Sequence, residues 1–236
     1  MDPTTLAIIF IICYLLGAIS FSRIAHKKLS GEGEIGPVDV KVAGTDHTYS
    51  FNSTGASTMG MLHGDRVGCL VGIMDMLKVF LPTLVVRLLY PGQPYFLYAA
   101  IAGMVGHIWP VFYRFRGGRG YSSIYGGLMA IEPVGAILCS MTGLLVGIFI
   151  LKDFAIAYLG GLWLIIPYLW FSTHDVHFLI YAIIVNILFL IVLAPDIRKA
   201  YKFRNQVDTN IRKDMAEWPM GRGILKLCDK LGIEIK

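Results

Sequence analysis

Nearly uncharged stretches of about 20 residues recur along this chain of 236 residues and constrain its fold more than any other feature. About 20 apolar residues in a helix span the hydrocarbon core of a bilayer. A soluble domain would interrupt such stretches with charged residues at every exposed turn. We therefore expect an all-α integral membrane protein.

The composition agrees with a membrane protein. Hydrophobic residues make up 56% of the chain and charged residues 16%, whereas soluble domains are about a quarter charged. The net charge of +5 would suggest nucleic acid as a partner of a soluble protein, but basic residues also gather on the cytoplasmic side of membrane proteins. We expect no nucleic-acid partner. The four cysteines show neither CxxC spacing nor histidine pairing, so we expect no disulfide framework and no metal site.

The apolar stretches predict seven helices in a transmembrane domain at residues 1–194, followed by a basic cytoplasmic tail at 195–236. Asp2 precedes the first stretch, where a secretory signal would carry positive charge, so we expect a retained first helix. The predicted helices cover residues 4–24, 67–89, 95–112, 121–131, 133–151, 153–170 and 176–194.

One division in this list needs an argument. The apolar region 121–151 is too long for one ordinary span and has Glu132-Pro133 in its middle. Proline starts or breaks a helix, and a carboxylate in hydrocarbon is costly. We therefore divide the region into a short helix and a longer one. A short helix in the membrane needs protein or water around its ends, which suggests a polar cavity beside residues 114–133.

The distribution of charge favours seven crossings, with the N-terminus outside and the C-terminus cytoplasmic. In that arrangement 19 of the 21 basic residues lie on the inner side, Lys78 lies within a helix and Arg87 lies outside. Six crossings would leave eight inside and 12 outside, against the positive-inside rule. The first loop, which joins the predicted helices 4–24 and 67–89, then shares the cytoplasmic face with the loop at 114–120 and the tail. We expect the active site at this face.

The loop at 114–120 is basic and rich in glycine. Its arginines can bind phosphate through paired N–H donors, and its glycines let backbone N–H groups approach an anion. The N-terminus of the helix that begins at residue 121 adds a favourable dipole. The alternative is a turn with a positive-inside signal, which needs the arginines but not the glycines. The residues are Arg114, Arg116, Gly117, Gly118, Arg119 and Gly120.

Three ionisable residues fall inside predicted membrane helices. His107 can be a hydrogen-bonded core residue, an acid–base group or a donor to an oxyanion. Asp75 and Lys78 are spaced to pair on one helix face, as a structural ion pair or as a link to the site.

Two polar segments complete the cytoplasmic face. Residues 50–58 are rich in hydroxyl groups and can bind phosphate or glycerol, or can serve as a turn and cap before a helix. The Asn52-Ser53-Thr54 glycosylation signal is discounted because we expect this loop in the cytoplasm. The tail, with ten of the 21 basic residues, is expected to be an amphipathic or disordered stretch on anionic lipid.

Residues 106–120, GHIWPVFYRFRGGRG, resemble the GHxxPxFxxFxGGKG motif of the bacterial acyl-phosphate:glycerol-3-phosphate acyltransferases, the PlsY family, with Arg119 in place of lysine. Three weaker similarities occur in the family's order. YLLGAISF at 14–21 is similar to YLLGSIPF, residues 52–58 to GNxGATN, and DMLK at 75–78 to DxxK.

The resemblance implies a reaction without metal or coenzyme. An acyl group moves from acyl-phosphate to the 1-hydroxyl of glycerol 3-phosphate, and lysophosphatidic acid and phosphate form. His107 and Arg119 would be catalytic. The other implied site residues bind substrate: Ser50, Asn52, Gly55, Ser57, Arg114, Arg116, Gly117, Gly118, Gly120 and Asn210.

The chain departs from the family pattern in several places. Its first loop is longer, Thr58 replaces an asparagine, Met61 falls where the family has arginine, and the tail motif survives only as Asn210-Ile211. Two alternatives therefore stay open. One is a non-catalytic relative that binds a phosphorylated lipid or partner, and the other is a small transporter that uses Asp75, Lys78 and His107. In the leading interpretation we expect a monomeric phospholipid-synthesis enzyme in the cell membrane.

Overall fold

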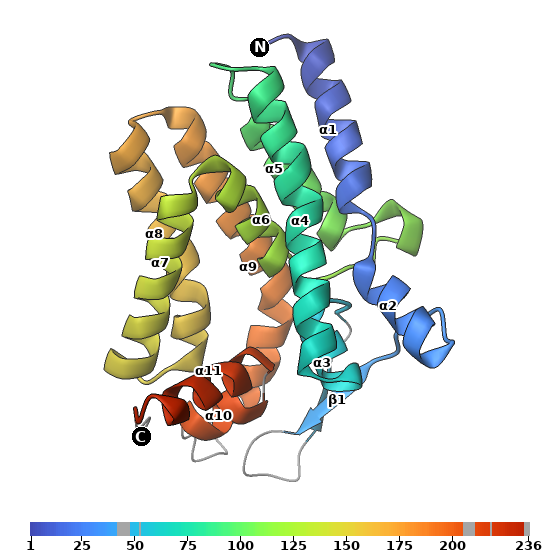
Figure 1. Cartoon of the computed structure of the whole chain (residues 1–236), viewed down its shortest axis with the longest axis vertical. Helices are drawn as coiled ribbons and strands as arrows, with labels where there is room; N and C mark the ends of the chain where they lie inside the picture. Colours follow the sequence, from blue (N-terminus) through green and yellow to red (C-terminus); the bar gives the residue numbers. More distant parts are fainter. Residues whose placement is uncertain (42–47, 52, 205–210, 218, 234–236) are drawn as a thin grey trace.

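In the computed structural model the chain is a bundle of long helices (Figure 1), described for all residues except 42–47, 52, 205–210, 218 and 234–236. Six segments in the described part are long and apolar enough to cross a membrane. The first joins α1 to α2, and the fourth joins α7 to the π-helical turn η2. The bounds are α1 Pro3–Gly17, α2 Phe21–Ser30, α4 Asp65–Leu89, α5 Tyr95–Ile108, α7 Pro133–Leu145, η2 Val146–Ile150, α8 Phe154–Thr173 and α9 Val176–Arg204.

The short helix α6 (Tyr121–Ile131) has the bounds that the sequence predicts. Its 11 residues are about 16 Å long, roughly half the hydrocarbon thickness of a bilayer. The chain turns at Glu132, and Pro133 starts α7, so the proposed division of residues 121–151 is confirmed. The start of α1 and the last described helix, α11 (Pro219–Lys230), lie at opposite ends of the bundle (Figure 1). Seven crossings and their orientation stay predictions, since α6 is too short to be counted as a span.

Two predicted helix boundaries are wrong. The first helix is interrupted after Gly17, and Ser20 caps a new helix α2, with the Arg23 N–H donating to Ser20 Oγ (3.4 Å). The last membrane helix, α9, does not stop before Pro195 but continues to Arg204. Proline removes one backbone hydrogen bond, and such a loss is tolerated in membrane helices when neighbouring groups compensate.

The first loop contains the only strands among the described residues, which the all-α prediction missed. Strands β1 (Val38–Lys41) and β2 (Thr48–Phe51) pair antiparallel, with Val38 opposite Phe51. Their valine and aromatic residues favour extended structure. Helix α3 (Ala56–His63) follows and packs closely on α4, where a Cβ added at Gly68 would lie 2.7 Å from Gly60 Cα.

Helix α5 forms the centre of the bundle, with 11 of its 14 residues buried. It packs against α1 through glycines. A Cβ at Gly17 would collide with the carbonyl of Gly103, and a Cβ at Gly106 would collide with the carbonyl of Tyr14. Small residues of this kind let membrane helices approach backbone to backbone. The contact fixes the C-terminal half of α5, which carries His107, against α1.

The described part of the tail folds against one end of the bundle (Figure 1). Helices α10 (Ile211–Glu217) and α11 (Pro219–Lys230) bury Met215, Leu225 and Cys228 against Ile148 and Ala157. The Arg222 guanidinium lies 2.5 Å from the Asp65 carboxylate on α4. These helices are amphipathic, as one alternative predicts, but the bundle covers part of their apolar face.

Candidate active site

The loop at residues 114–120, here called the Arg-Gly loop, folds back onto the end of α5. A 3-10 turn, η1 (Val111–Tyr113), leads into it, and the Gly118 N–H donates to the carbonyl of His107 (3.2 Å). Arg114 and Phe115 hold left-handed backbone angles, with φ at 53° and 58°. Such angles are uncommon for residues other than glycine and mark a tightly constrained segment.

Two glycines are required by what surrounds the loop. A Cβ at Gly117 would collide with the carbonyl of His107. A Cβ at Gly118 would collide with His107 Nε2 and would lie 3.1 Å from the Thr54 carbonyl oxygen. The backbone can therefore pass directly beside the imidazole only because side chains are absent at both positions.

The first loop meets the Arg-Gly loop at this point. The Thr54 N–H donates to the carbonyl of Gly117 (3.1 Å), and Thr54 is buried. A Cβ at Gly55, which precedes α3, would lie 3.8 Å from Gly118 Cα. The structure thus brings Gly55, Gly117 and Gly118 together with His107, as expected for one site.

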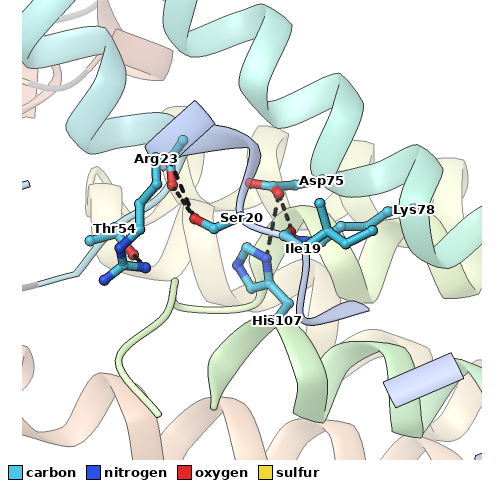
Figure 2. A network of polar contacts seen from close by, with 8 residues as sticks. Ile19, Ser20, Arg23, Thr54, Asp75, Lys78 and His107 are labelled. Atoms are coloured by element: carbon cyan, nitrogen blue, oxygen red, sulfur yellow. Dashed lines mark hydrogen bonds and ion pairs between the residues drawn. The ribbon is translucent and has the colours of Figure 1, made fainter. Parts of the chain in front are cut away.

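Arg23 also reaches this junction, and sequence reasoning counted it only as a cytoplasmic charge. Figure 2 shows its side chain extending from α2 to Thr54, and Nη1 donates to Thr54 Oγ1 (3.2 Å). Its guanidinium carbon lies 4.6 Å from the centre of the Tyr113 ring. The sequence prediction includes Thr54 only as a member of the hydroxyl-rich segment 50–58 and not as an individual site residue. The position of Arg23 just after the family-like segment 14–21 was the available signal.

His107 belongs to a buried charged cluster (Figure 2). Oδ1 of Asp75 lies 2.8 Å from Lys78 Nζ and 3.6 Å from His107 Nδ1. Lys78 Nζ also donates to the carbonyl of Ile19 (2.7 Å), where α1 gives way to α2. The predicted Asp75–Lys78 pair is confirmed, and it is also a link to the site. With Nδ1 towards Asp75, the imidazole turns Nε2 towards Gly118.

Arg119 points to a different side of the loop. Its Nε lies 2.8 Å from Oδ2 of Asp196 on α9, and its side chain is 12% exposed. The predicted helix 176–194 ends before Pro195 and therefore leaves Asp196 out of the site, whereas α9 continues through both residues. Tyr121 is stacked on Tyr158 of α8, with ring centres 4.2 Å apart. Both rings also contact Phe189 of α9, and the three form an aromatic cluster. Arg119 is thus paired with α9, whereas His107, at the end of α5, lies beside Asp75 on α4.

The remaining predicted site residues take no part in the contacts between His107, Thr54 and the glycine pair, or they lie outside the described part of the chain. Arg114 and Arg116 are exposed, and Gly120 has the left-handed φ of 92° that glycine favours. Ser50 on β2 donates to the Asp39 carboxylate across the hairpin, and Ser57 is half-buried in the first turn of α3. Asn52 and Asn210 lie outside the described residues.

Comparison with known proteins gives consistent results. The family model described as glycerol-3-phosphate acyltransferase matches residues 7–203. Glycerol-3-phosphate acyltransferase 3 of Dehalococcoides mccartyi is 28% identical over 211 residues, which cover 82% of this chain and 91% of the relative. The glycerol-3-phosphate acyltransferase of Aquifex aeolicus is 32% identical over 145 residues, 61% of this chain and 68% of the relative.

Two crystal structures of PlsY (YgiH), an integral membrane glycerol 3-phosphate acyltransferase, have a similar fold. The lysophosphatidic acid form superposes with a TM-score of 0.69 at 23% identity, over 85% of this chain and 93% of the other. The glycerol 3-phosphate form gives 0.68 at 25% identity, over 85% and 94%. The matched residues 7–203 include both loops of the site and all six long helices in part or whole. The chain therefore belongs to the glycerol-3-phosphate acyltransferase family.

Proposed function

We propose that this protein transfers a fatty acyl group from acyl-phosphate to the 1-hydroxyl of glycerol 3-phosphate. The products are lysophosphatidic acid and inorganic phosphate, for use in phospholipid synthesis. Membrane acylation of glycerol 3-phosphate is the activity named for the relatives. One observation supports the proposal most strongly. The first loop joins the Arg-Gly loop through Thr54 and Gly117, and His107 and Arg23 lie at the junction.

Both substrates carry phosphate, and the site has the groups that bind phosphate. Arg119 presents a planar guanidinium, whose contact with Asp196 uses Nε on one edge. The glycines at 117, 118 and 120 let backbone N–H groups come close to phosphate oxygens. The N-terminus of α6 lies directly after these glycines, and its dipole favours an anion.

The chemistry needs no strong protein base. Acyl-phosphate is a mixed anhydride, so its carbonyl carbon is already activated and phosphate is a good leaving group. The 1-hydroxyl oxygen bonds to that carbon, the bond from the carbon to the phosphate oxygen breaks, and the leaving phosphate takes the hydroxyl proton. His107 Nδ1 faces Asp75 and Nε2 faces the loop. When both ring nitrogens are protonated, the Nε2 N–H can donate to the oxygen that becomes negative in the transition state.

The cellular setting is part of the same proposal. The positive-inside rule supports a position of both loops of the site at the cytoplasmic face of the cell membrane. Glycerol 3-phosphate would arrive from the cytosol and the acyl chain from the bilayer. We propose that one copy of the chain suffices, since both loops and His107 come from the same chain.

The decisive experiment is an acyl-transfer assay on the purified protein in detergent or lipid mesophase. Palmitoyl-phosphate and glycerol 3-phosphate are supplied, and phosphate release and lysophosphatidic acid are measured. Arg119→Ala is expected to abolish transfer, whereas Arg66→Ala, at an exposed position of α4, should not. No turnover, despite saturable binding of either phosphate compound, would refute the proposed acyl transfer. It would favour the alternative of a non-catalytic relative that binds phosphate compounds.

A further inference from the structure

Arg23 is a half-buried arginine without a carboxylate partner among the described residues. Within the described part of the chain, no carboxylate oxygen lies within 4.0 Å of its guanidinium, although Glu34 is near enough to act on it electrostatically. The other cations of the site differ. Lys78 is paired with Asp75, and Arg119 is paired with Asp196. Removing a charge from water without a counterion costs free energy, so a position of this kind favours an anion.

The Arg23 guanidinium contacts residues from both loops of the site or next to them. Thr54, from the first loop, accepts the hydrogen bond from Nη1. The ring of Tyr113, directly before the Arg-Gly loop, lies 4.6 Å from Cζ. Thr54 is itself bound to Gly117 through its N–H. Arg23 is therefore fixed beside the glycine backbone, although it comes from a different helix.

An arginine side chain has five N–H donors. Among the described residues, the side chain of Arg23 makes one hydrogen bond, the bond to Thr54. The remaining donors form a planar edge that matches two oxygens of a phosphate group. The hydroxyl of Thr54, which already accepts from Arg23, can donate its own proton to the same group. The two side chains together offer a phosphate site of several donors.

We propose that Arg23 is a substrate-binding residue whose guanidinium, held by Thr54 and Tyr113, binds the phosphate group of a substrate. The inference rests on the proposed acyl transfer and adds a residue to it. Phosphate on glycerol 3-phosphate and phosphate on the acyl donor present the same chemistry, so the experiment must separate the two.

The test compares Arg23→Gln and Arg23→Lys with the matched control Lys27→Gln, an exposed cation on the same helix. Each protein is purified with the wild type, and its folding is checked by size-exclusion profile and thermal unfolding. Binding of inorganic phosphate and of glycerol 3-phosphate is measured by calorimetry. Transfer is then measured with each substrate varied in turn.

Arg23→Gln is expected to weaken phosphate binding by roughly 10- to 100-fold and to raise KM for one of the two substrates by a similar factor. The substrate whose KM rises identifies the phosphate that Arg23 binds. The value of kcat should change much less, Arg23→Lys should recover only part of the affinity, and Lys27→Gln should resemble the wild type.

Equal phosphate affinity in wild type and a folded Arg23→Gln would overturn the inference, whether or not the protein turns over. Loss of kcat with unchanged KM and unchanged binding would also overturn it, because Arg23 would then act on structure or chemistry. A wild type that binds phosphate through Arg23 but transfers no acyl group would refute the proposed function and leave this binding site standing.

Discussion

His107 and Asp75 come from two different helices, and Nδ1 of the imidazole lies 3.6 Å from Oδ1 of the carboxylate. Both side chains are almost fully buried, and Lys78 shares the same carboxylate oxygen. One acidic group therefore compensates the lysine and also sets the direction of the imidazole. The glycine pair of the loop then packs on the opposite edge of the ring.

Asp75→Asn is expected to destabilise the protein because it leaves Lys78 buried without its counterion. Breaking a buried pair in this way costs about 3–5 kcal/mol. Thermal unfolding in detergent measures the loss. Asp65→Asn is the control, since its pair with Arg222 is partly exposed and should contribute about 1 kcal/mol or less. An equal fall in unfolding temperature for both variants would contradict the larger contribution of the buried cluster to stability.

Gly118→Ala is expected to reduce kcat by about 100-fold, because the new methyl group must displace the His107 imidazole or the Thr54 carbonyl. Gly33→Ala is the matched control, since no atom lies within 4 Å of a Cβ at that position. Both variants are assayed for phosphate release at saturating substrate. Wild-type turnover by Gly118→Ala would mean that the close contact with His107 has no part in the reaction.

Asp196 is expected to orient Arg119. The Asp196 carboxylate lies 2.8 Å from Nε of Arg119, and a contact at this distance fixes the direction of the planar guanidinium. Asp196→Ala should raise KM for a phosphate substrate by about tenfold, and Asp196→Glu should raise it less. A lower KM in Asp196→Ala would show instead that the carboxylate competes with substrate for Arg119.

The tail is expected to dock on the bundle through one face of α11. Leu225 is buried and Leu227, on the same helix, is 57% exposed, so the two leucines form a matched pair. Leu225→Ala should weaken docking by about 2–5 kcal/mol, and protease should cleave the tail faster. Leu227→Ala should be cleaved at the wild-type rate. Equal cleavage of both variants would argue against docking.

The predicted orientation can be tested with single cysteines in a background where exposed Cys69 is serine. Gln93, in the turn between α4 and α5, should be labelled by an impermeant thiol reagent in intact cells when changed to cysteine. Lys226→Cys, in the tail, should react only after the membrane is opened. Labelling of both from the same side would refute the odd number of crossings.

Local signals in the sequence predicted much of this fold. Glu132-Pro133 marks the end of α6 within its own few residues, because proline chemistry acts on the adjacent turn. The family-like run at 106–120 likewise identified the Arg-Gly loop. Pro195 shows the limit of the same rule, since α9 continues through it. Whether a proline ends a membrane helix depends on neighbours that the local sequence does not contain.

The partners of the charged residues could not be predicted for a related reason. Arg23 and Thr54 are 31 positions apart, and Arg119 meets Asp196 across the packing of α6 against the later helices. These contacts depend on how helices approach one another. The Asp75–Lys78 pair was predictable because a single helical turn brings the two residues together.

The bare backbone contact at Gly106 has a consequence for genetics. The Tyr14 carbonyl fills the space where a side chain at position 106 would stand, and the Tyr14 hydroxyl donates to the carbonyl of Trp109 (2.8 Å). The height of His107 along the bundle is therefore set by its packing against α1, a helix that holds none of the proposed site residues. In a screen for inactive mutants, substitutions at Gly106 and Tyr14 would be found together with substitutions in the Arg-Gly loop. A map of the positions where activity is lost would therefore extend well beyond the residues that contact the ligand.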